Sequence, residues 1–190
     1  QKTLPPLPNV KGAVVMRIAP FPSGALHIGN ARPIVLNDEY VRMYRGKLLL
    51  IIDDTIGSEE KTISKDAYDL IPEAIDWLGV HYEKNILYKS DRLDLYYKYA
   101  EEIIMKDKAY VCMCSAEVLR ENRAHGRECS CRSQNVQKNL GLFKKMFGMK
   151  PGEASLRIKT SLQDKNPAFR DRVLFRISDR EHPRVGKKYR

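Results

Sequence analysis

The stretch 22–30, Pro-Ser-Gly-Ala-Leu-His-Ile-Gly-Asn, carries residue types that suit the binding of a phosphate group. It joins an apolar run at 13–19, which predicts a buried strand, to residues 31–44, whose apolar positions recur at helical spacing. The first N–H groups of a helix have no partner within the helix, and the helix dipole favours an anion at that end. His27 can donate a hydrogen bond to phosphate, and Gly29 lets a nucleotide approach the backbone. The alternative is an ordinary turn between strand and helix, where Pro and Gly are common.

Two carboxylates, Asp53 and Asp54, follow a second apolar run at 47–52. A carboxylate at the end of a strand can bind the ammonium group of an amino acid, while Arg17 binds a carboxylate through a bidentate pair of hydrogen bonds. A pocket built in this way recognises the arrangement of charges on its ligand. The alternative is that the two carboxylates cap the helix that follows.

Four cysteines form two close pairs, Cys112 with Cys114 and Cys129 with Cys131, separated by fourteen residues. Two close pairs of this kind suit a tetrahedral structural zinc ion. His125 is a possible substitute for one of the four ligands. The alternative is a set of free thiols, because disulfides are rare in a reducing compartment.

The charge of the chain is distributed unevenly. Residues 1–100 contain 13 Lys and Arg and 13 Asp and Glu, whereas residues 101–190 contain 21 Lys and Arg and 11 Asp and Glu. The whole net charge of +10 therefore lies in the second half. Such an asymmetry predicts a module that binds a polyanion, such as nucleic acid, beside a neutral module.

Three strands and three helices are expected to alternate in the first half, at 13–19, about 30–45, 47–52, about 64–78, 85–88 and about 91–107. This alternation predicts an α/β fold with a parallel sheet, in which ligands bind at the carboxyl ends of the strands. The segments 19–30 and 53–55 both fall at such ends, so we expect them to converge on one crevice. Pro72 should bend or interrupt the second helix.

The second half predicts a Lys-rich helix within 135–152 and two alternating strands at 154–159 and 172–177. We expect the basic residues of these strands to lie on an exposed face and to contact RNA phosphates: Arg157, Lys159, Arg172 and Arg176. The alternative is that these charges only keep the strands soluble.

The segment 22–29 resembles the HIGH signature of class I aminoacyl-tRNA synthetases, and the longer segment 17–29 resembles their glutamyl/glutaminyl branch. The similarity extends from about residue 10 to the end, with further support at 31–40 and 46–55, and is greatest to the archaeal glutamyl-tRNA synthetases. Two positions depart from the pattern. Asn30 replaces the second His of the signature, and Phe21 stands where a small or polar residue is usual.

The resemblance implies the first half of a Rossmann-like nucleotide-binding fold, into which a mixed α+β domain is inserted. It divides the chain into an N-terminal lead-in at 1–11, the first half of the catalytic domain at 12–108, and an inserted domain at 109–190. The inserted domain would hold the acceptor stem of tRNA. Some relatives carry a zinc knuckle in this domain, which supports zinc at the four cysteines.

The resemblance also assigns roles to residues of the first half. ATP, accompanied by Mg²⁺, would be bound by His27, Gly29, Asn30 and Gly24, with Gly24 shaping the turn. Glutamate would be bound by Arg17, Ala19 and Asp53, with Arg17 on its carboxylate and Asp53 on its α-amino group. Asp54 would orient the loop.

The reaction implied is that of a glutamate–tRNA ligase, which activates glutamate with ATP and transfers it to the 3′ end of tRNA. The first step needs positioning and charge neutralisation rather than a protein nucleophile. The Lys-Met-Ser-Lys-Ser signature of the class does not occur in the sequence; residues 63–65 resemble part of it but lie too early. We therefore expect an amino-terminal fragment without the anticodon-binding domain, inactive alone.

Two other functions stay open at this point. One is a non-catalytic, zinc-containing RNA-binding module, and the other is a nucleotidyltransferase of the same superfamily that acts on a small metabolite. The sequence has no apolar run of membrane-spanning length, and its Pro-rich start does not resemble a signal peptide. We expect a soluble, cytoplasmic protein.

Overall fold

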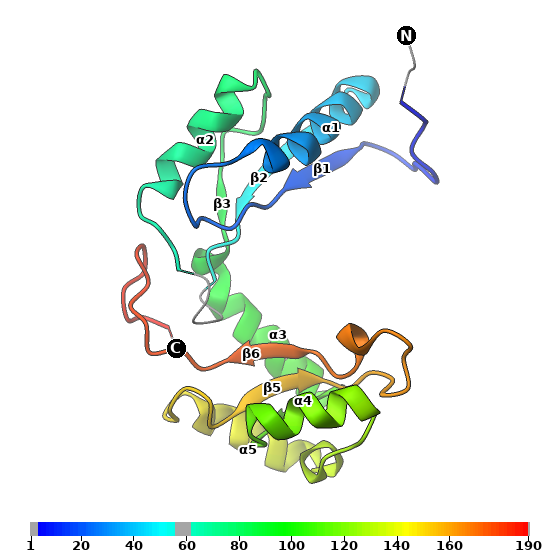
Figure 1. Cartoon of the computed structure of the whole chain (residues 1–190), viewed down its shortest axis with the longest axis vertical. Coiled ribbons are helices and arrows are strands. Elements are labelled where there is room, and N and C mark those ends of the chain that lie inside the picture. The colour runs from blue at the N-terminus through cyan, green and yellow to red at the C-terminus, as the bar shows by residue number, and fades with distance from the viewer. Residues whose placement is uncertain (1–3, 56–61, 190) are drawn as a thin grey trace. The chain divides into compact units, whose positions relative to one another are not determined.

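The computed structural model describes residues 4–55 and 62–189 (Figure 1). These residues form two compact units. The first contains the described residues up to Arg92 together with His182–Arg184, and the second contains Leu93–Glu181 and the described residues from Val185 onward. Among the described residues, no helix is both long and apolar enough to cross a membrane.

The first unit contains three parallel strands in the order β1-β2-β3 (Figure 1). Its elements are β1 (Val15–Ile18), α1 (Ile28–Tyr44), β2 (Lys47–Ile52), α2 (Ala67–Trp77), β3 (Leu87–Tyr88) and the 3₁₀ turn η1 (Lys89–Arg92). Val15 pairs with Lys47 and Ile51 pairs with Leu87. The parallel α/β arrangement predicted from the alternation of strands and helices is confirmed.

The central strand, β2, is the centre of the first core. Leu48, Leu50 and Ile52 are fully or almost fully buried, whereas Lys47 at its start is exposed. Helix α2 covers this core with Ala67, Ile71 and Ile75, all completely buried. Pro72 lies within the helix, which continues through it, so of the predicted bend or interruption the interruption does not occur.

Helix α1 buries fewer of its apolar residues than their helical spacing predicts. Ile34 and Asp38 are buried, while Val35 and Leu36 are 39% and 42% exposed. The Asp38 carboxylate accepts a hydrogen bond of 2.7 Å from Arg42 Nε, one turn later. A buried charge is tolerated here because it is paired.

The second unit contains a three-stranded antiparallel sheet in the order β4-β5-β6. Its elements are α3 (Leu93–Met105), β4 (Ala109–Cys112), α4 (Ala116–His125), the 3₁₀ turn η2 (Ser130–Ser133), α5 (Val136–Met146), β5 (Ser155–Ile158), the 3₁₀ turn η3 (Pro167–Phe169) and β6 (Val173–Arg176). Strand β4 and helix α4 were not expected from the sequence. Every residue of β4 is buried, so it lacks the alternation that marks a half-exposed strand.

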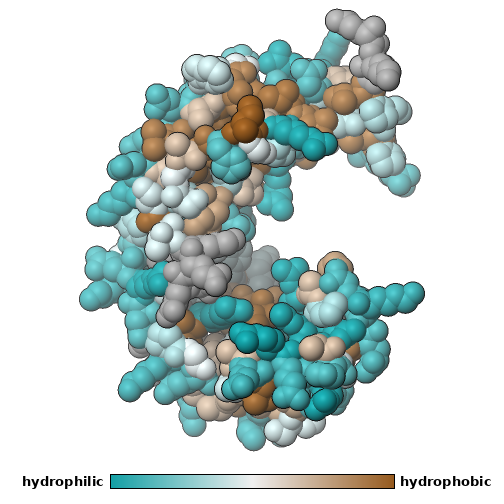
Figure 2. Space-filling model, in the orientation of Figure 1, coloured by the Kyte–Doolittle hydropathy of each residue, from teal (hydrophilic) through white to brown (hydrophobic). Residues whose placement is uncertain are grey.

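The two faces of this sheet are covered differently. Val111 and Leu156, which are paired in the sheet, join a core with Ile104 of α3 and Phe143 of α5. Tyr110 and the two buried cysteines form a separate small cluster. Helix α4 buries none of its residues, and Figure 2 shows hydrophilic side chains over its visible face.

Strand β6 contains a β-bulge at Leu174. Leu156 pairs with Phe175, but the next residue, Arg157, pairs with Val173, so Leu174 is left out of the register. A bulge shifts the alternation of side chains between the two faces. Arg172 and Arg176 are nevertheless both exposed, as predicted, while Val173 and Phe175 between them are half-buried.

Candidate active site and cysteine cluster

His27 closes the N-terminus of α1. Its Nδ1 accepts a hydrogen bond of 3.1 Å from the Gly29 N–H, while Asn30 Oδ1 accepts one of 3.0 Å from the His27 N–H. This reciprocal capping box satisfies N–H groups that the helix itself leaves without partners. Because Nδ1 is the acceptor, the neutral ring carries its proton on Nε2, where it can donate to a ligand. The side chain of His27 is exposed, so a ligand can reach it.

Gly29 is required by this cap. A Cβ atom added at Gly29 would lie 2.8 Å from His27 Cε1 and 3.0 Å from His27 Nδ1. Glycine at this position thus leaves room for the His27 ring. The sequence alone did not suggest this reason for a glycine at position 29. Gly24 has a φ of +154°, which L side chains rarely adopt, so the turn before the helix depends on it as well.

The turn of the signature lies beside the end of β2. The Asp53 N–H donates to the Pro20 carbonyl at 2.9 Å, which joins the segments that follow β1 and β2. The Ser64 N–H, just before α2, donates to the Pro22 carbonyl at 2.9 Å. The two sequence segments expected to converge at the carboxyl ends of the strands therefore do so. Ala19, half-buried, lies directly before this junction.

Asp53 is already paired within the protein. Its Oδ2 lies 2.8 Å from Lys89 Nζ, at the start of η1, and its Oδ1 accepts a hydrogen bond of 3.3 Å from Thr55 Oγ1. Arg17 on β1 is exposed, and no hydrogen bond or ion pair holds its guanidinium group within the described residues. The site therefore presents an available cation and a carboxylate that already holds an ammonium group.

Asp54 is completely buried and organises the end of the first sheet. Its carboxylate accepts hydrogen bonds from the Ser90 N–H at 2.8 Å, Ser90 Oγ at 2.7 Å and Tyr68 Oη at 3.0 Å. Burial and then the nearby Asp54 carboxylate raise the pKa of Tyr68 well above its ordinary value, so its hydroxyl stays a donor. Asp54 therefore joins the end of β2 to α2 and η1.

Two residues that the sequence analysis did not single out complete this network. His182 Nε2 lies 2.6 Å from the Asp54 carbonyl oxygen, and its Nδ1 accepts from the Arg184 N–H. The Arg184 guanidinium lies 3.6 Å from the centre of the Tyr88 ring and binds both carboxylate oxygens of Asp91 at 3.1 Å. Nothing in the local sequence indicates these contacts, because the partners lie about a hundred residues apart.

The four cysteines lie together in the second unit. Their sulfur atoms are all within 4.8 Å of one another, and the Cys112 and Cys129 sulfurs are 3.7 Å apart. A tetrahedral zinc site with bonds of about 2.3 Å separates its sulfurs by about 3.8 Å. The arrangement thus fits the ion. His125 Nδ1 donates to the Glu121 carbonyl at 3.0 Å, and His125 is not part of the cluster.

The local surroundings shift the pKa values of the cysteines in different directions. Burial raises the pKa of Cys112 and of Cys114. Burial also opposes ionisation of Cys129, but hydrogen bonds from the Cys112 thiol and from the backbone N–H groups of Cys131 and Arg132 outweigh it and lower its pKa. Thiolates are the form that binds metal.

The basic strand residues differ in their exposure. Arg157 is only 5% exposed, which corrects the expectation that it lies on an exposed face. Its Nε donates to the Asp171 carbonyl at 2.9 Å, and its guanidinium lies 5.5 Å from the centre of the Tyr110 ring. The reason is that Arg157 is paired with Tyr110 across β4 and β5, on the face of the sheet where the buried Tyr110 and Asp171 lie. Lys159 pairs with Asp107 at 2.6 Å, whereas Arg172 and Arg176 are exposed.

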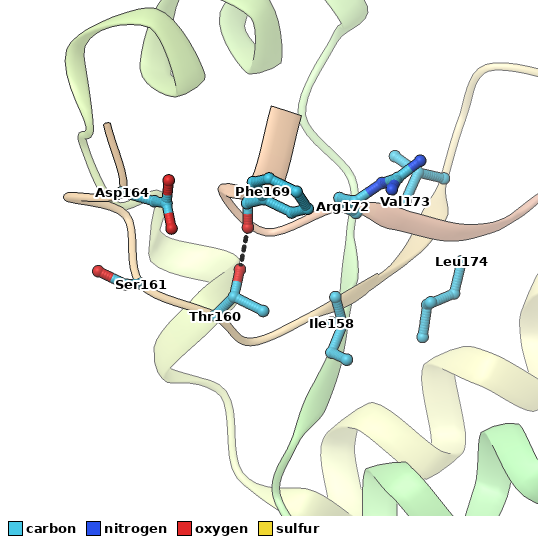
Figure 3. A pocket seen from close by; sticks show the side chains of 8 residues that line it. All are labelled: Ile158, Thr160, Ser161, Asp164, Phe169, Arg172, Val173 and Leu174. Carbon is cyan, nitrogen blue, oxygen red and sulfur yellow. Dashed lines mark hydrogen bonds between the residues drawn. The ribbon is translucent and has the colours of Figure 1, made fainter. Parts of the chain in front are cut away.

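A pocket of about 560 Å³ lies in the second unit, between the segment that follows β5 and the segment that leads into β6 (Figure 3). Its lining includes Ile158, Thr160, Phe169, Arg172 and Leu174.

Asp171 accepts most of the hydrogen bonds that connect β4, η2 and the segment after β5. It is 1% exposed, and its carboxylate accepts from Tyr110 Oη at 2.8 Å, Arg132 Nε at 2.9 Å and the Thr160 N–H at 2.7 Å. Arg132 follows the last cysteine directly. The network therefore connects the cysteine cluster to the loops at the ends of β5 and β6.

A family model for the catalytic domain of class I tRNA synthetases (E and Q) matches residues 13–190. The chain belongs to this family. It is 49% identical over 184 residues to a glutamate–tRNA ligase of Methanothermobacter marburgensis, covering 97% of this chain and 33% of that protein. It is also 49% identical over 193 residues to a glutamate–tRNA ligase of Pyrococcus abyssi, covering 100% of this chain and 34% of that protein. The resemblance noted in the sequence is confirmed.

The chain spans about a third of the length of these synthetases. A crystal structure of glutamate–tRNA synthetase from Elizabethkingia anophelis matches 78% of the chain and 33% of that protein, with a TM-score of 0.56 and 24% identity. A glutamate tRNA ligase from Elizabethkingia meningosepticum in complex with its amino acid matches with a TM-score of 0.55, at 21% identity. At this identity the two structures support the synthetase fold and not individual residues.

Proposed function

We propose that the chain contributes part of the catalytic domain of a glutamate–tRNA ligase. Glutamate attacks the α-phosphate of ATP through its α-carboxylate, forming glutamyl-adenylate and releasing pyrophosphate. A ribose hydroxyl at the 3′ end of tRNA then takes the glutamyl group and releases AMP. The observation that carries this proposal is the hydrogen bond from the Asp53 N–H to the Pro20 carbonyl, which joins the end of β2 to the turn that leads into the capped helix α1, in a chain of this family.

Each predicted residue has a position that suits its proposed role. His27 presents Nε2–H to a phosphate, and the Gly24 and Gly29 backbone shapes the turn and the helix start. The Asn30 side-chain oxygen is occupied by the cap, so its amide nitrogen is the group left to bind ATP. Mg²⁺ would accompany ATP and neutralise its phosphates. These residues act by positioning and charge stabilisation, so no covalent intermediate with the protein is needed.

The amino-acid site is proposed around Arg17, Ala19 and Asp53. The exposed Arg17 guanidinium is free to bind the glutamate side-chain carboxylate in a bidentate manner. Asp53 would bind the α-ammonium group in place of Lys89. Specificity for an acidic amino acid follows, because a neutral analogue leaves the arginine without its partner.

The second unit is proposed to bind the acceptor stem of tRNA. Residues 101–190, nearly all of which lie in this unit, carry the whole net charge of +10, and Arg172 and Arg176 are exposed, with no side-chain hydrogen bond or ion pair among the described residues. The proposed inserted domain at 109–190 starts at β4. The second unit begins earlier, at Leu93, because α3 packs on the same core, and it leaves out His182–Arg184. We also propose zinc at Cys112, Cys114, Cys129 and Cys131, where it would hold the two cysteine pairs together.

The test is glutamate-dependent exchange of pyrophosphate into ATP by the synthetase that contains this chain. Asp53→Asn and Arg17→Gln should each reduce exchange at low glutamate by raising the KM for glutamate, with a smaller effect on the KM for ATP. The 190 residues alone should bind ATP weakly and exchange negligibly, because they lack the Lys-rich second signature, and losing one set of transition-state donors costs about 10²–10³-fold in rate. Exchange driven by another amino acid in preference to glutamate would contradict the proposal.

A further inference from the structure

The segment His182–Arg184 belongs to the first unit, although the residues before and after it belong to the second. His182 is only 7% exposed. Its Nδ1 accepts a hydrogen bond of 3.1 Å from the Arg184 N–H, so the neutral ring carries its proton on Nε2. Nε2 lies 2.6 Å from the Asp54 carbonyl oxygen and therefore donates to it. A buried side chain thus holds one particular peptide group at the end of β2.

Arg184 fixes this segment against β3 and η1. Its guanidinium binds both carboxylate oxygens of Asp91 at 3.1 Å and donates to Ser90 Oγ at 3.1 Å. It also lies 3.6 Å from the centre of the Tyr88 ring. A bidentate pair fixes the orientation of a guanidinium as well as its position. The N–H group that orients the His182 ring therefore belongs to a residue that is itself held in place.

Asp53 lies between two hydrogen-bonded peptide groups. Its own N–H donates to the Pro20 carbonyl at 2.9 Å, and the peptide group between Asp54 and Thr55 accepts from His182. Thr55 Oγ1, which follows that peptide group, donates to Asp53 Oδ1 at 3.3 Å. Loss of the His182 donor would remove the hydrogen bond that orients the 54–55 peptide group, and with it the position of the Thr55 hydroxyl. The orientation of the Asp53 carboxylate therefore depends on His182.

We propose that His182 is a positioning residue for the amino-acid site, which holds the 53–55 loop so that the Asp53 carboxylate meets the α-ammonium group of glutamate. The inference rests on the proposed function, which gives Asp53 that ligand. A carboxylate that is already oriented loses less conformational freedom when it binds, so the affinity is higher. The effect is selective, because His182 acts on the partner of the ammonium group and not on the groups that bind the carboxylates.

The test uses the full synthetase that contains this chain and two ligands, glutamate by calorimetric titration and glutarate by competition. Glutarate keeps both carboxylates of glutamate and lacks only the amino group. His182→Asn removes the donor at the position of Nε2, so the dissociation constant for glutamate should rise about 3- to 10-fold, the effect of losing about one hydrogen bond. The affinity for glutarate and the KM for ATP should not change.

Three further variants separate positioning from a general effect on the fold. His182→Gln places an amide nitrogen where Nε2 lies, so it should restore the affinity for glutamate. Arg184→Met releases the segment that orients the His182 ring, so it should weaken glutamate binding and leave glutarate binding unchanged. His81→Asn makes the same substitution at an exposed position of the first unit and should alter neither affinity.

Asp53→Asn distinguishes failure of this inference from failure of the proposed function. If Asp53→Asn weakens glutamate binding but His182→Asn does not, the positioning role is overturned while the proposed site stands. Equal weakening of glutamate and glutarate by His182→Asn, or a Gln variant no better than the Asn variant, would also overturn it. If Asp53→Asn leaves glutamate binding unchanged, the proposed site itself fails and the inference fails with it.

Discussion

Lys89 and Asp53 form an ion pair in which Lys89 Nζ lies 2.8 Å from Asp53 Oδ2. The next residue, Ser90, binds the next carboxylate, Asp54, through both its N–H and its hydroxyl. Two successive residues of η1 therefore hold two successive carboxylates at the end of β2. One of these carboxylates is buried and structural. The other is partly exposed and paired with an ammonium group, which the substrate's α-ammonium group would replace under the proposed function.

Replacing Lys89 should strengthen the binding of glutamate. Both side chains of the pair are about one-third exposed, and such ion pairs contribute about 0–1 kcal/mol. Lys89→Met removes the competing ammonium, so the dissociation constant for glutamate should fall by up to about fivefold in a calorimetric titration of the synthetase. Lys84→Met, at an exposed position in the same unit, is the control and should have no effect. Weaker binding by Lys89→Met would mean that Lys89 itself contacts the substrate.

Substitutions of Asp54 and of Asp53 should differ in their effects on the thermal stability of the protein. Removing a partner from a buried ion pair or network costs about 3–5 kcal/mol, so Asp54→Ala should lower the melting temperature strongly. Asp53→Ala removes only a partly exposed ion pair and should change the melting temperature little. Thermal unfolding followed by circular dichroism compares the two. Equal melting temperatures would contradict the structural role assigned to Asp54.

Gly29→Ala should reduce ATP binding with little net change in stability. The new methyl group displaces the His27 ring, and losing this cap costs about 0.5–2 kcal/mol, whereas Ala favours the helix over Gly by about 1 kcal/mol. Gly141→Ala is the matched control, because nothing lies within 4 Å of its added methyl group in α5. That variant should be stabilised by up to about 1 kcal/mol and bind ATP normally. The measurements are chemical unfolding and ATP titration.

Metal analysis tests the cysteine cluster. If the four sulfurs share one ion, elemental analysis should give about one zinc per chain. A strong chelator should then loosen the segment between the two cysteine pairs, because metal binding contributes to its folding. Amide hydrogen exchange should show faster exchange at 115–128 after chelation, and no change in the first unit. A metal-free preparation with unchanged exchange on chelator addition would refute the assignment.

Replacing an arginine by glutamate should have different effects at exposed and at buried positions of the second unit. Arg176→Glu should weaken tRNA binding and flatten its salt dependence, because the affinity reflects the release of counterions from phosphates. Arg157→Glu should instead destabilise the second unit, since it places a carboxylate beside the buried Asp171 network. Filter binding over a range of salt concentrations, together with melting curves, distinguishes the two effects. Unchanged tRNA affinity in Arg176→Glu would remove this residue from the RNA-binding surface.

Local sequence was sufficient to predict the strands and helices of the first unit, although not its boundary. Strand β2 was predicted at its observed bounds, and the elements on either side of the signature were located to within two or three residues. This succeeded because a buried parallel strand is a continuous apolar run and a helix starts at an identifiable cap. The prediction of which residues of α1 are buried was wrong in part. Val35 and Leu36 are exposed, whereas the charged Asp38 is buried and paired with Arg42.

The sequence by itself determined that the chain is an α/β protein with a synthetase signature, two cysteine pairs and a basic second half. These properties follow from residue types, spacing and periodicity, all of which are local. Only the tertiary structure decided that Arg157 is buried, that Asp53 is paired with Lys89, and that His182 and Arg184 belong with the first unit. Each of these depends on a long-range contact or on the register of a bulged strand, and no local pattern of residues specifies either one.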